Sequence, residues 1–125
     1  MLTKSKAFSS FSVNDLQMAK AFYQKILGLN VVDNPMDLIE IHAEGGNKIL
    51  VYPKPDHAPA TFTVLNFPVK NIDEKVDELI SKGVSFEQYD GQIKTDEKGI
   101  SHNNGGPTIA WFKDPAGNIF SLIEE

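Results

Sequence analysis

The sequence contains no cysteine among its 125 residues. This absence excludes disulfide bonds, thiolate metal sites and cysteine nucleophiles. Positive charge is also scarce, because 12 Lys and Arg residues stand against 17 Asp and Glu residues and leave a net charge of −5. A surface that tracks the phosphates of a nucleic acid needs the opposite balance. We therefore expect no nucleic-acid partner.

Long apolar runs are absent as well. No stretch approaches the roughly 20 residues that cross a bilayer, and the positive residues 1–6 are not followed by an apolar segment long enough for a secretory signal. We expect a cytoplasmic protein that makes no contact with a membrane. What the chain does have is 41% hydrophobic residues, which are sufficient to fill the core of one domain of this length.

The first half of the chain has the pattern of a strand, a helix and three strands. Residues 8–13 mix aromatic and β-branched side chains with serines, which is typical of a half-buried strand. Asp15 is a good helix N-cap, and the apolar residues after it recur every three or four positions as far as a stop at Gly28. Three further strands are predicted at residues 29–32, 38–43 and 48–52.

The second half repeats this order after a proline-rich connector. Residues 61–69 are predicted to form a strand, and Asn71 is predicted to cap a helix, with Glu74 completing a capping box. Gly83 ends that helix. The remaining strands are predicted at residues 84–89, 108–112 and 119–123, and the closing acidic residues are expected to be solvated.

The two halves match each other position by position. A constant offset of 56 residues relates Val13, Asp15, Leu16 and Tyr23 to Val69, Asn71, Ile72 and Leu79. The alternative is coincidence between two ordinary capped helices. We predict an α+β fold in which a single domain, residues 1–125, contains two tandem βαβββ modules, residues 7–53 and 61–124, joined by a connector, residues 54–60. Their curved mixed sheets are expected to enclose a cavity.

The residues that carry this pattern resemble a known family. The run Val13-Asn14-Asp15-Leu16, the pairs Phe22-Tyr23 and Leu27-Gly28, and the closing turn Asp114-Pro115-Ala116-Gly117-Asn118 are similar to the signature of the vicinal oxygen chelate superfamily. That superfamily includes glyoxalases, bleomycin resistance-type binding proteins and extradiol dioxygenases. The resemblance runs from about Ala7 to Glu124 and implies a glyoxalase/bleomycin resistance-like fold. It also implies a homodimer, because resistance-type members bind a drug across a dimer.

The resemblance also implies where metal ligands would stand. Metal-dependent members place a His or Glu on the first strand of each module and a carboxylate on a late strand. Those positions fall on Phe8, Val64 and Ser121, which are poor ligands or none, and on Glu40, which is a good one. One ligand in four does not build a divalent site. We therefore expect no metal and no other cofactor, with a divalent metal as the alternative.

Glu40 and His42 are the candidate catalytic residues. Strand alternation places them on one face and the two neighbouring isoleucines on the other. If the isoleucines pack on the helix, the carboxylate and the imidazole point into the cavity, where they could form an acid–base pair or bind a polar ligand. The alternative is a strand whose outer face is simply solvated.

The same alternation gives a set of candidate ligand-binding residues, most of them apolar or aromatic. His102 joins the set because it lies in a long aperiodic stretch from Asp90, which is either a lid or a mobile loop. His57, in the connector, is expected to be an exposed surface residue. The candidates are Phe8, Ser10, Glu40, His42, Tyr52, Phe62, Val64, Asn66, His102, Trp111 and Ser121.

These observations predict a metal-independent protein that binds a small apolar or aromatic organic molecule between its modules. The first alternative is a metal-dependent glyoxalase-like lyase or dioxygenase with displaced ligands drawn from Glu40, His42 and His102. The second alternative is a degenerate module that makes only protein–protein contacts. Fold resemblance alone does not choose among them.

Overall fold

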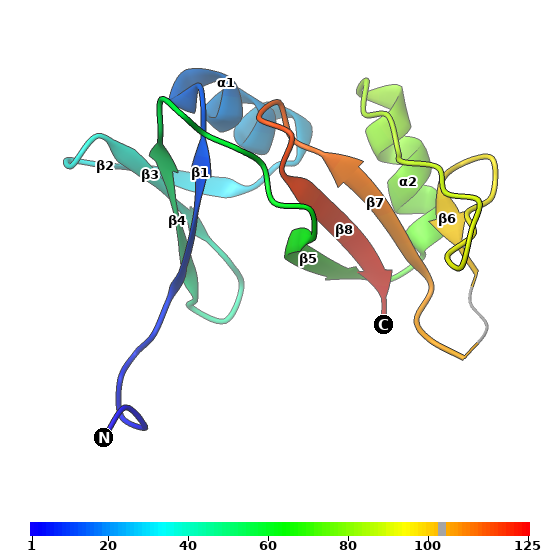
Figure 1. Cartoon of the computed structure of the whole chain (residues 1–125), viewed down its shortest axis with the longest axis horizontal. Helices are drawn as coiled ribbons and strands as arrows, with labels where there is room; N and C mark the ends of the chain where they lie inside the picture. Colours follow the sequence, from blue (N-terminus) through cyan, green and yellow to red (C-terminus); the bar gives the residue numbers. More distant parts are fainter. Residues whose placement is uncertain (103–104) are drawn as a thin grey trace. The chain divides into compact units, whose positions relative to one another are not determined.

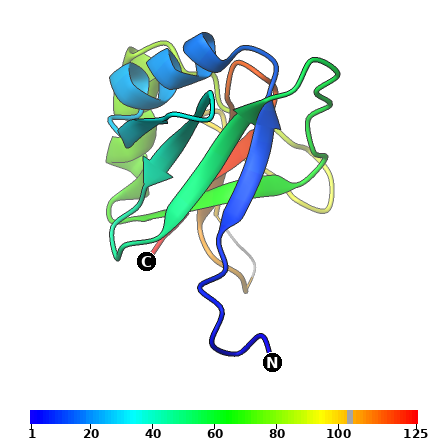
Figure 2. The ribbon, with the colours of Figure 1, turned by 90° about the vertical axis from the view of Figure 1, so that its left-hand side faces the viewer.

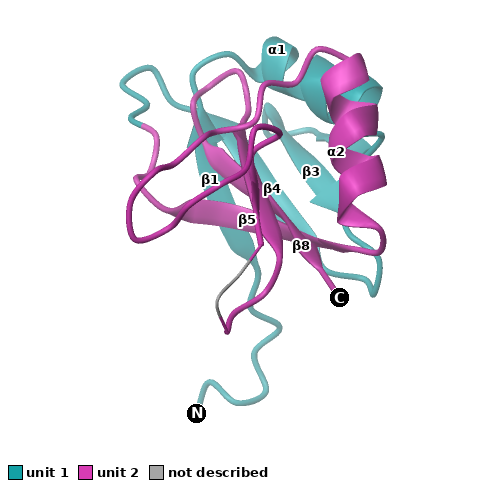
Figure 3. Cartoon of the chain, turned by 90° about the vertical axis from the view of Figure 1, so that its right-hand side faces the viewer, with its two compact units in different colours: residues 1–58 teal, residues 59–125 magenta. Residues whose placement is uncertain are grey.

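The chain forms two compact units, and each contains one four-stranded sheet (Figure 1; Figure 3). The first unit comprises residues 1–58 and the second residues 59–125. The structure is a computed structural model that describes residues 1–102 and 105–125. No helix in these ranges is both long enough and apolar enough to cross a membrane.

The first unit has the predicted order of strand, helix and three strands. Its sheet has the strand order β1-β4-β3-β2, in which β1 is parallel to β4 (Figure 2) and the other neighbours are antiparallel. The elements are β1 (Ser9–Val13), α1 (Leu16–Ala21), the π-helix η1 (Phe22–Ile26), β2 (Asn30–Asn34), β3 (Leu38–His42) and β4 (Lys48–Pro53).

One face of this sheet carries the buried core of the unit. Asp15 caps α1 as predicted, because its carboxylate accepts a hydrogen bond from the Met18 amide at 3.0 Å. The helix lies against β3 and β4, so the side chains that point toward it leave water. The buried residues of β1, β3 and β4 are Val13, Ile39, Ile41, Ile49 and Val51. Their neighbours along each strand therefore point to the opposite face of the sheet.

The second unit repeats the architecture with the strand order β5-β8-β7-β6. Its edge-to-face aromatic cluster places the Phe120 ring 5.9 Å from Phe67 and 5.7 Å from Phe112. The α+β fold of two βαβββ modules is therefore confirmed. The elements of this unit are β5 (Thr63–Val69), α2 (Ile72–Ser81), β6 (Ile100–Ser101), β7 (Ile109–Lys113) and β8 (Ile119–Glu124).

The strand predicted at residues 84–89 is wrong. That segment makes only an isolated bridge, between Phe86 and Phe112, and the edge strand beside β7 is instead β6. Gly99 explains the exchange, since a Cβ there would lie 2.6 Å from the Phe86 Cβ and 3.0 Å from the Glu87 carbonyl oxygen. The chain at Gly99 therefore passes close to Phe86 and Glu87 of the predicted strand, and it continues into β6, which pairs with β7.

The predicted capping box at the start of α2 is also wrong. Asn71 has a left-handed backbone with φ of 56° and makes no side-chain capping bond. The Ile72 amide donates instead to the Glu124 carboxylate at 3.0 Å. One closing acidic residue, expected to be merely solvated, therefore caps a helix that begins 52 positions earlier.

Candidate functional site

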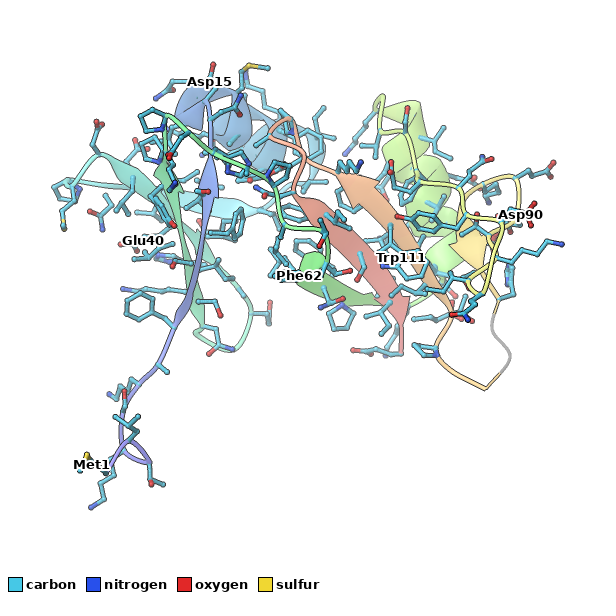
Figure 4. The ribbon with its side chains drawn as sticks, in the orientation of Figure 1. Met1, Asp15, Glu40, Phe62, Asp90 and Trp111 are labelled. Atoms are coloured by element: carbon cyan, nitrogen blue, oxygen red, sulfur yellow. The ribbon has the colours of Figure 1, made fainter. Side chains whose placement is uncertain are left out.

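The open face of the first sheet brings together polar and apolar side chains from all four strands. In the register of the sheet, Glu40 stands opposite Val32 on β2 and Leu50 on β4, and Leu50 stands opposite Ser10 on β1. Because the isoleucines of β3 face α1, Glu40 projects from the open face, where Figure 4 labels it. The predicted placement of Glu40 and His42 on one face is confirmed by their contact.

Glu40 is held by hydrogen bonds on both carboxylate oxygens. Its Oε1 lies 2.7 Å from His42 Nε2, and its Oε2 accepts a hydrogen bond from Asn34 Nδ2 at 2.8 Å. The bond with His42 is the largest cause that lowers the pKa of Glu40 below 4.5, followed by the bond from Asn34, and both outweigh burial, which raises it. An ionised carboxylate only accepts hydrogen bonds, so His42 Nε2 carries the proton between them.

A pocket of about 650 Å³ opens beside this carboxylate. The Glu40 side chain is only 15% exposed, whereas the Phe8 ring remains 65% exposed in front of β1. Leu50 supplies a second apolar wall. The pocket therefore combines the exposed ring of Phe8 with the largely covered, hydrogen-bonded carboxylate of Glu40. Its lining residues are Lys6, Ala7, Phe8, Asn34, Glu40, Gly46, Asn47, Lys48 and Leu50.

Sequence reasoning missed the amide and the ammonium groups of this pocket. Asn34 lies at the end of β2, and Lys48 Nζ lies 3.8 Å from Glu40 Oε1. Strand alternation does not place Asn34 on the same face as Glu40 unless the register of the β2–β3 hairpin is also known. Lys48 is opposite His42 in the observed register, which depends on the length of the glycine turn between β3 and β4.

Two further candidates of the first unit lie on the same open face without lining the pocket. Ser10 is exposed on β1, and Tyr52 is half-exposed opposite Ser12. His57 does not behave as predicted. It is half-buried, and its Nδ1 lies 2.6 Å from Ser12 Oγ, so the connector histidine is tied to the first strand. Its expected role as an exposed surface residue is wrong.

The candidates of the second unit gather around Ser121. The buried Ser121 hydroxyl donates to Asn66 Oδ1 at 2.5 Å, and Ser121 stands opposite Trp111 in the sheet. Trp111, labelled in Figure 4, packs edge to face on Tyr89 with ring centroids 5.5 Å apart. Phe62 precedes β5 and is 67% exposed.

The strand alternation that selected Phe62, Val64 and Asn66 as residues of one face is interrupted in the structure, so this prediction is wrong. A β-bulge lies between Thr63 and Leu65, so that Val64 is the extra residue with no partner on β8. Thr63 pairs with Ile119 and Asn66 with Ser121, which interrupts the alternation that sequence spacing assumes. A bulge of this kind leaves no period in the sequence that would reveal it.

His102 pairs with an acidic residue of its own loop. Its Nε2 lies 2.8 Å from Asp96 Oδ2, and the aperiodic stretch contains a bridge between Asp90 and Lys94. From Asp90 to His102, the stretch is therefore partly ordered by these contacts and is not structureless. The stretch that was expected to form a lid or a mobile loop also includes Asn103 and Asn104, which lie outside the described residues.

The donor set does not fit a divalent metal. Within residues 1–102 and 105–125, no group of three or more His, Asp or Glu side chains could hold an ion. Phe8 and Val64 carry no donor atoms and the Ser121 hydroxyl is bound to Asn66, which leaves Glu40 as the single good ligand among the four implied positions. What the site can do is accept hydrogen bonds or a proton at an ionised carboxylate beside an apolar wall.

The fold agrees with one class of protein. Residues 8–122 match the model of the Glyoxalase/Bleomycin resistance protein/Dioxygenase superfamily. The chain therefore belongs to this superfamily. A search of curated proteins found no match.

Solved structures share the fold across the whole chain. A superfamily member from Sphaerobacter thermophilus DSM 20745 is 24% identical, with a TM-score of 0.70 over 95% of this chain and 97% of that one. TnmS3, an antibiotic binding protein from Streptomyces sp. CB03234, is 21% identical, with a TM-score of 0.69 over 98% of both chains. The fosfomycin resistance protein FosX from Listeria monocytogenes is 16% identical, with a TM-score of 0.72 over 98% of this chain and 93% of that one.

Proposed function

We propose that the chain is a metal-independent binding protein that holds a small apolar or aromatic organic molecule in the pocket beside Glu40. The observation that carries this proposal is the pairing of an exposed aromatic ring with a nearly covered, ionised carboxylate in one hollow of about 650 Å³. Binding sites for small molecules typically combine apolar walls with a few fixed polar groups in a space of this size.

The lining residues define what the ligand must offer. Phe8 and Leu50 provide surface for an aromatic or aliphatic body. Glu40, whose oxygens accept from His42 and Asn34, provides a fixed acceptor for an N–H or O–H group of the ligand. We therefore expect an amphipathic molecule with a flat apolar part and at least one hydrogen-bond donor. An antibiotic-binding relative of the same fold is consistent with this class of ligand.

The test is a binding screen with two variants and a control. Aromatic amines, phenols and their methylated analogues, which lack the donor, are titrated by calorimetry into the wild-type protein. Phe8→Ala is expected to weaken binding of all ligands by about tenfold, since an exposed ring contributes roughly 1–2 kcal/mol when a ligand covers it. Glu40→Gln is expected to weaken only the ligands that carry a donor.

Met36→Ala is the matched control, because Met36 is an exposed apolar side chain of the same unit that does not line the pocket. Its affinities are expected to equal those of the wild type. Elemental analysis of protein purified without chelator completes the test. Stoichiometric nickel, zinc, iron or manganese would overturn metal independence and favour a lyase or dioxygenase, whereas failure of every ligand would favour a protein–protein module.

A further inference from the structure

A second hollow lies within the segment that follows Asp90. Figure 4 labels Asp90 at the start of this segment. The volume of the hollow is about 540 Å³. The hollow belongs entirely to the second unit, whereas the pocket of the proposed function belongs to the first. Its lining residues are Gly91, Gln92, Ile93, Lys94, Thr95, Asp96, Ile100, Ser101 and His102.

Two consecutive turns build this hollow and fix its walls. The Thr95 amide donates to the Tyr89 carbonyl at 3.0 Å, and the Thr95 hydroxyl oxygen accepts from the Tyr89 amide at 2.8 Å. The Asp96 amide then donates to the Ile100 carbonyl at 2.8 Å. Lys98, in the second turn, reaches the carboxylates of Asp73 and Asp77 on α2 at 3.0 and 2.8 Å. The segment is thus anchored both to itself and to the helix.

Asp96 orients the imidazole of His102. Asp96 Oδ1 accepts hydrogen bonds from the Lys98 and Ile100 amides, both at 2.9 Å, and Oδ2 lies 2.8 Å from His102 Nε2. Burial raises the pKa of Asp96, but the bonds from the Ile100 amide, His102 and the Lys98 amide outweigh it and leave the pKa below its usual value. The ionised carboxylate therefore holds a proton on Nε2 and leaves Nδ1 as the second site of the ring.

Two groups that line the hollow have capacity left for a ligand. Among the described residues, His102 makes no hydrogen bond or ion pair except with Asp96, and Lys94 has no ion-pair partner. Of the other charged groups of the segment, Lys98 is bound by α2 and Asp96 by His102 and two amides, whereas Asp90, opposite Lys94 in an isolated bridge, and Glu97 make no ion pair among the described residues. Ile93 and Ile100 supply apolar surface between these polar groups.

From this arrangement we infer that the hollow binds a small organic acid, whose carboxylate pairs with the Lys94 ammonium and with the imidazolium of His102. Binding takes up one proton, which comes from the acid or from solvent and resides on His102 Nδ1. Asp96 stabilises the resulting imidazolium through Nε2. The negative charges of Asp96 and of the ligand carboxylate are then balanced by the positive charges of His102 and Lys94. The isoleucines cover the apolar body of the acid.

Benzoate is the probe, and benzamide, which has nearly the same shape without the charge, is its control. Amide signals of the ¹⁵N-labelled protein are followed during titration at about 0.15 M salt, where long-range charge effects are screened. We expect benzoate to shift the signals of residues 91–96 and 100–102 in a saturable manner, and benzamide to leave them in place.

Three variants complete the experiment. Lys94→Gln and His102→Gln are each expected to weaken benzoate binding by at least about tenfold, as the loss of a charge-assisted hydrogen bond does. Lys70→Gln removes an exposed lysine of the same unit that does not line the hollow, and it is expected to change nothing.

Three results would overturn the inference. They are equal shifts with benzamide, unchanged affinity in both the Lys94 and the His102 variants, or benzoate shifts confined to the residues around Glu40. The last result would assign the acid to the first pocket, so the two proposals fail separately.

Discussion

At the scale of single residues, Glu40 has more partners than its place on an open sheet face requires. A solvated glutamate would leave its carboxylate to water, whereas Glu40 uses both oxygens within the sheet and is 15% exposed. The partners come from β2 and from β3 itself, which ties the ionised state of this carboxyl to the folded arrangement of the strands.

The acid stability of the protein should therefore depend on Glu40. Its pKa is lower in the folded chain than the ordinary value of 4.5, with the hydrogen bond from His42 as the largest cause. The stability gained from the ionised form is fully present above that ordinary value and is lost as the pH falls through the lower folded pKa. In urea denaturation between about pH 7 and pH 3, Glu40→Gln should lose less stability on acidification than the wild type.

Glu44→Gln is the control for this measurement. Glu44 is exposed in the turn between β3 and β4 and has no partner among the described residues. Its acid profile is expected to follow the wild type. An identical slope in Glu40→Gln and the wild type would contradict the coupling of Glu40 to the fold.

Sequence reasoning succeeds for residues whose environment is set by their own strand. Glu40 and His42 share a face because they are two positions apart on an uninterrupted strand. It fails for Val64, where a bulge shifts the register, and for His57, whose partner Ser12 is 45 positions away in the chain. Local spacing contains no information about either effect.

At the scale of elements, α2 depends on a residue that no local pattern links to it. The cap at the Ile72 amide comes from Glu124 at the end of β8, across 52 positions. Asn71, which the pattern favoured as the cap, adopts φ of 56° and makes no side-chain capping bond. The helix is predictable from its apolar period, but its start is fixed by the neighbouring strand.

Removing this cap should destabilise the protein measurably. Glu124→Ala is expected to lower the free energy of unfolding by about 1 kcal/mol, because the Ile72 amide loses its acceptor and the acidic group leaves the helix N-terminus. Denaturant titration gives this value directly. Glu125→Ala, one position further, is the control and should leave stability unchanged, and equal effects of the two variants would refute a specific cap.

The segment between α2 and β7 marks the limit of prediction for elements. Residues 84–89 have the apolar composition of a strand, and Phe86 does bridge to Phe112. The edge of β7 is taken by Ile100 and Ser101, because the turn at Asp96 folds the chain back and Gly99 allows the close approach. Composition identifies segments able to pair, but not which of two competitors wins the edge.

At the scale of the whole molecule, the tandem repeat leaves comparable features in both units. Each sheet has two edge strands, and a large aromatic ring directly precedes the first strand of each unit. Phe8 and Phe62 are 65% and 67% exposed, so each ring presents apolar surface to water. Phe8 lines the pocket beside Glu40, whereas Phe62 lines neither of the two hollows discussed above.

We therefore predict a homodimer in which a second copy of the chain covers Phe62. A ring of this size that leaves water contributes roughly 1.5–3 kcal/mol, which is sufficient to shift a dimer equilibrium by one to two orders of magnitude. Sedimentation equilibrium over a dilution series should give twice the chain mass of 13.8 kDa for the wild type. The Phe62→Ser variant should dissociate at a markedly higher protein concentration than the wild type.

Ile80→Ser is the control, because it replaces a partly exposed apolar side chain on α2 with a hydroxyl, and it should dissociate at the same concentration as the wild type. A wild-type mass of one chain at every concentration would refute the dimer, and equal behaviour of Phe62→Ser and the wild type would place the interface elsewhere.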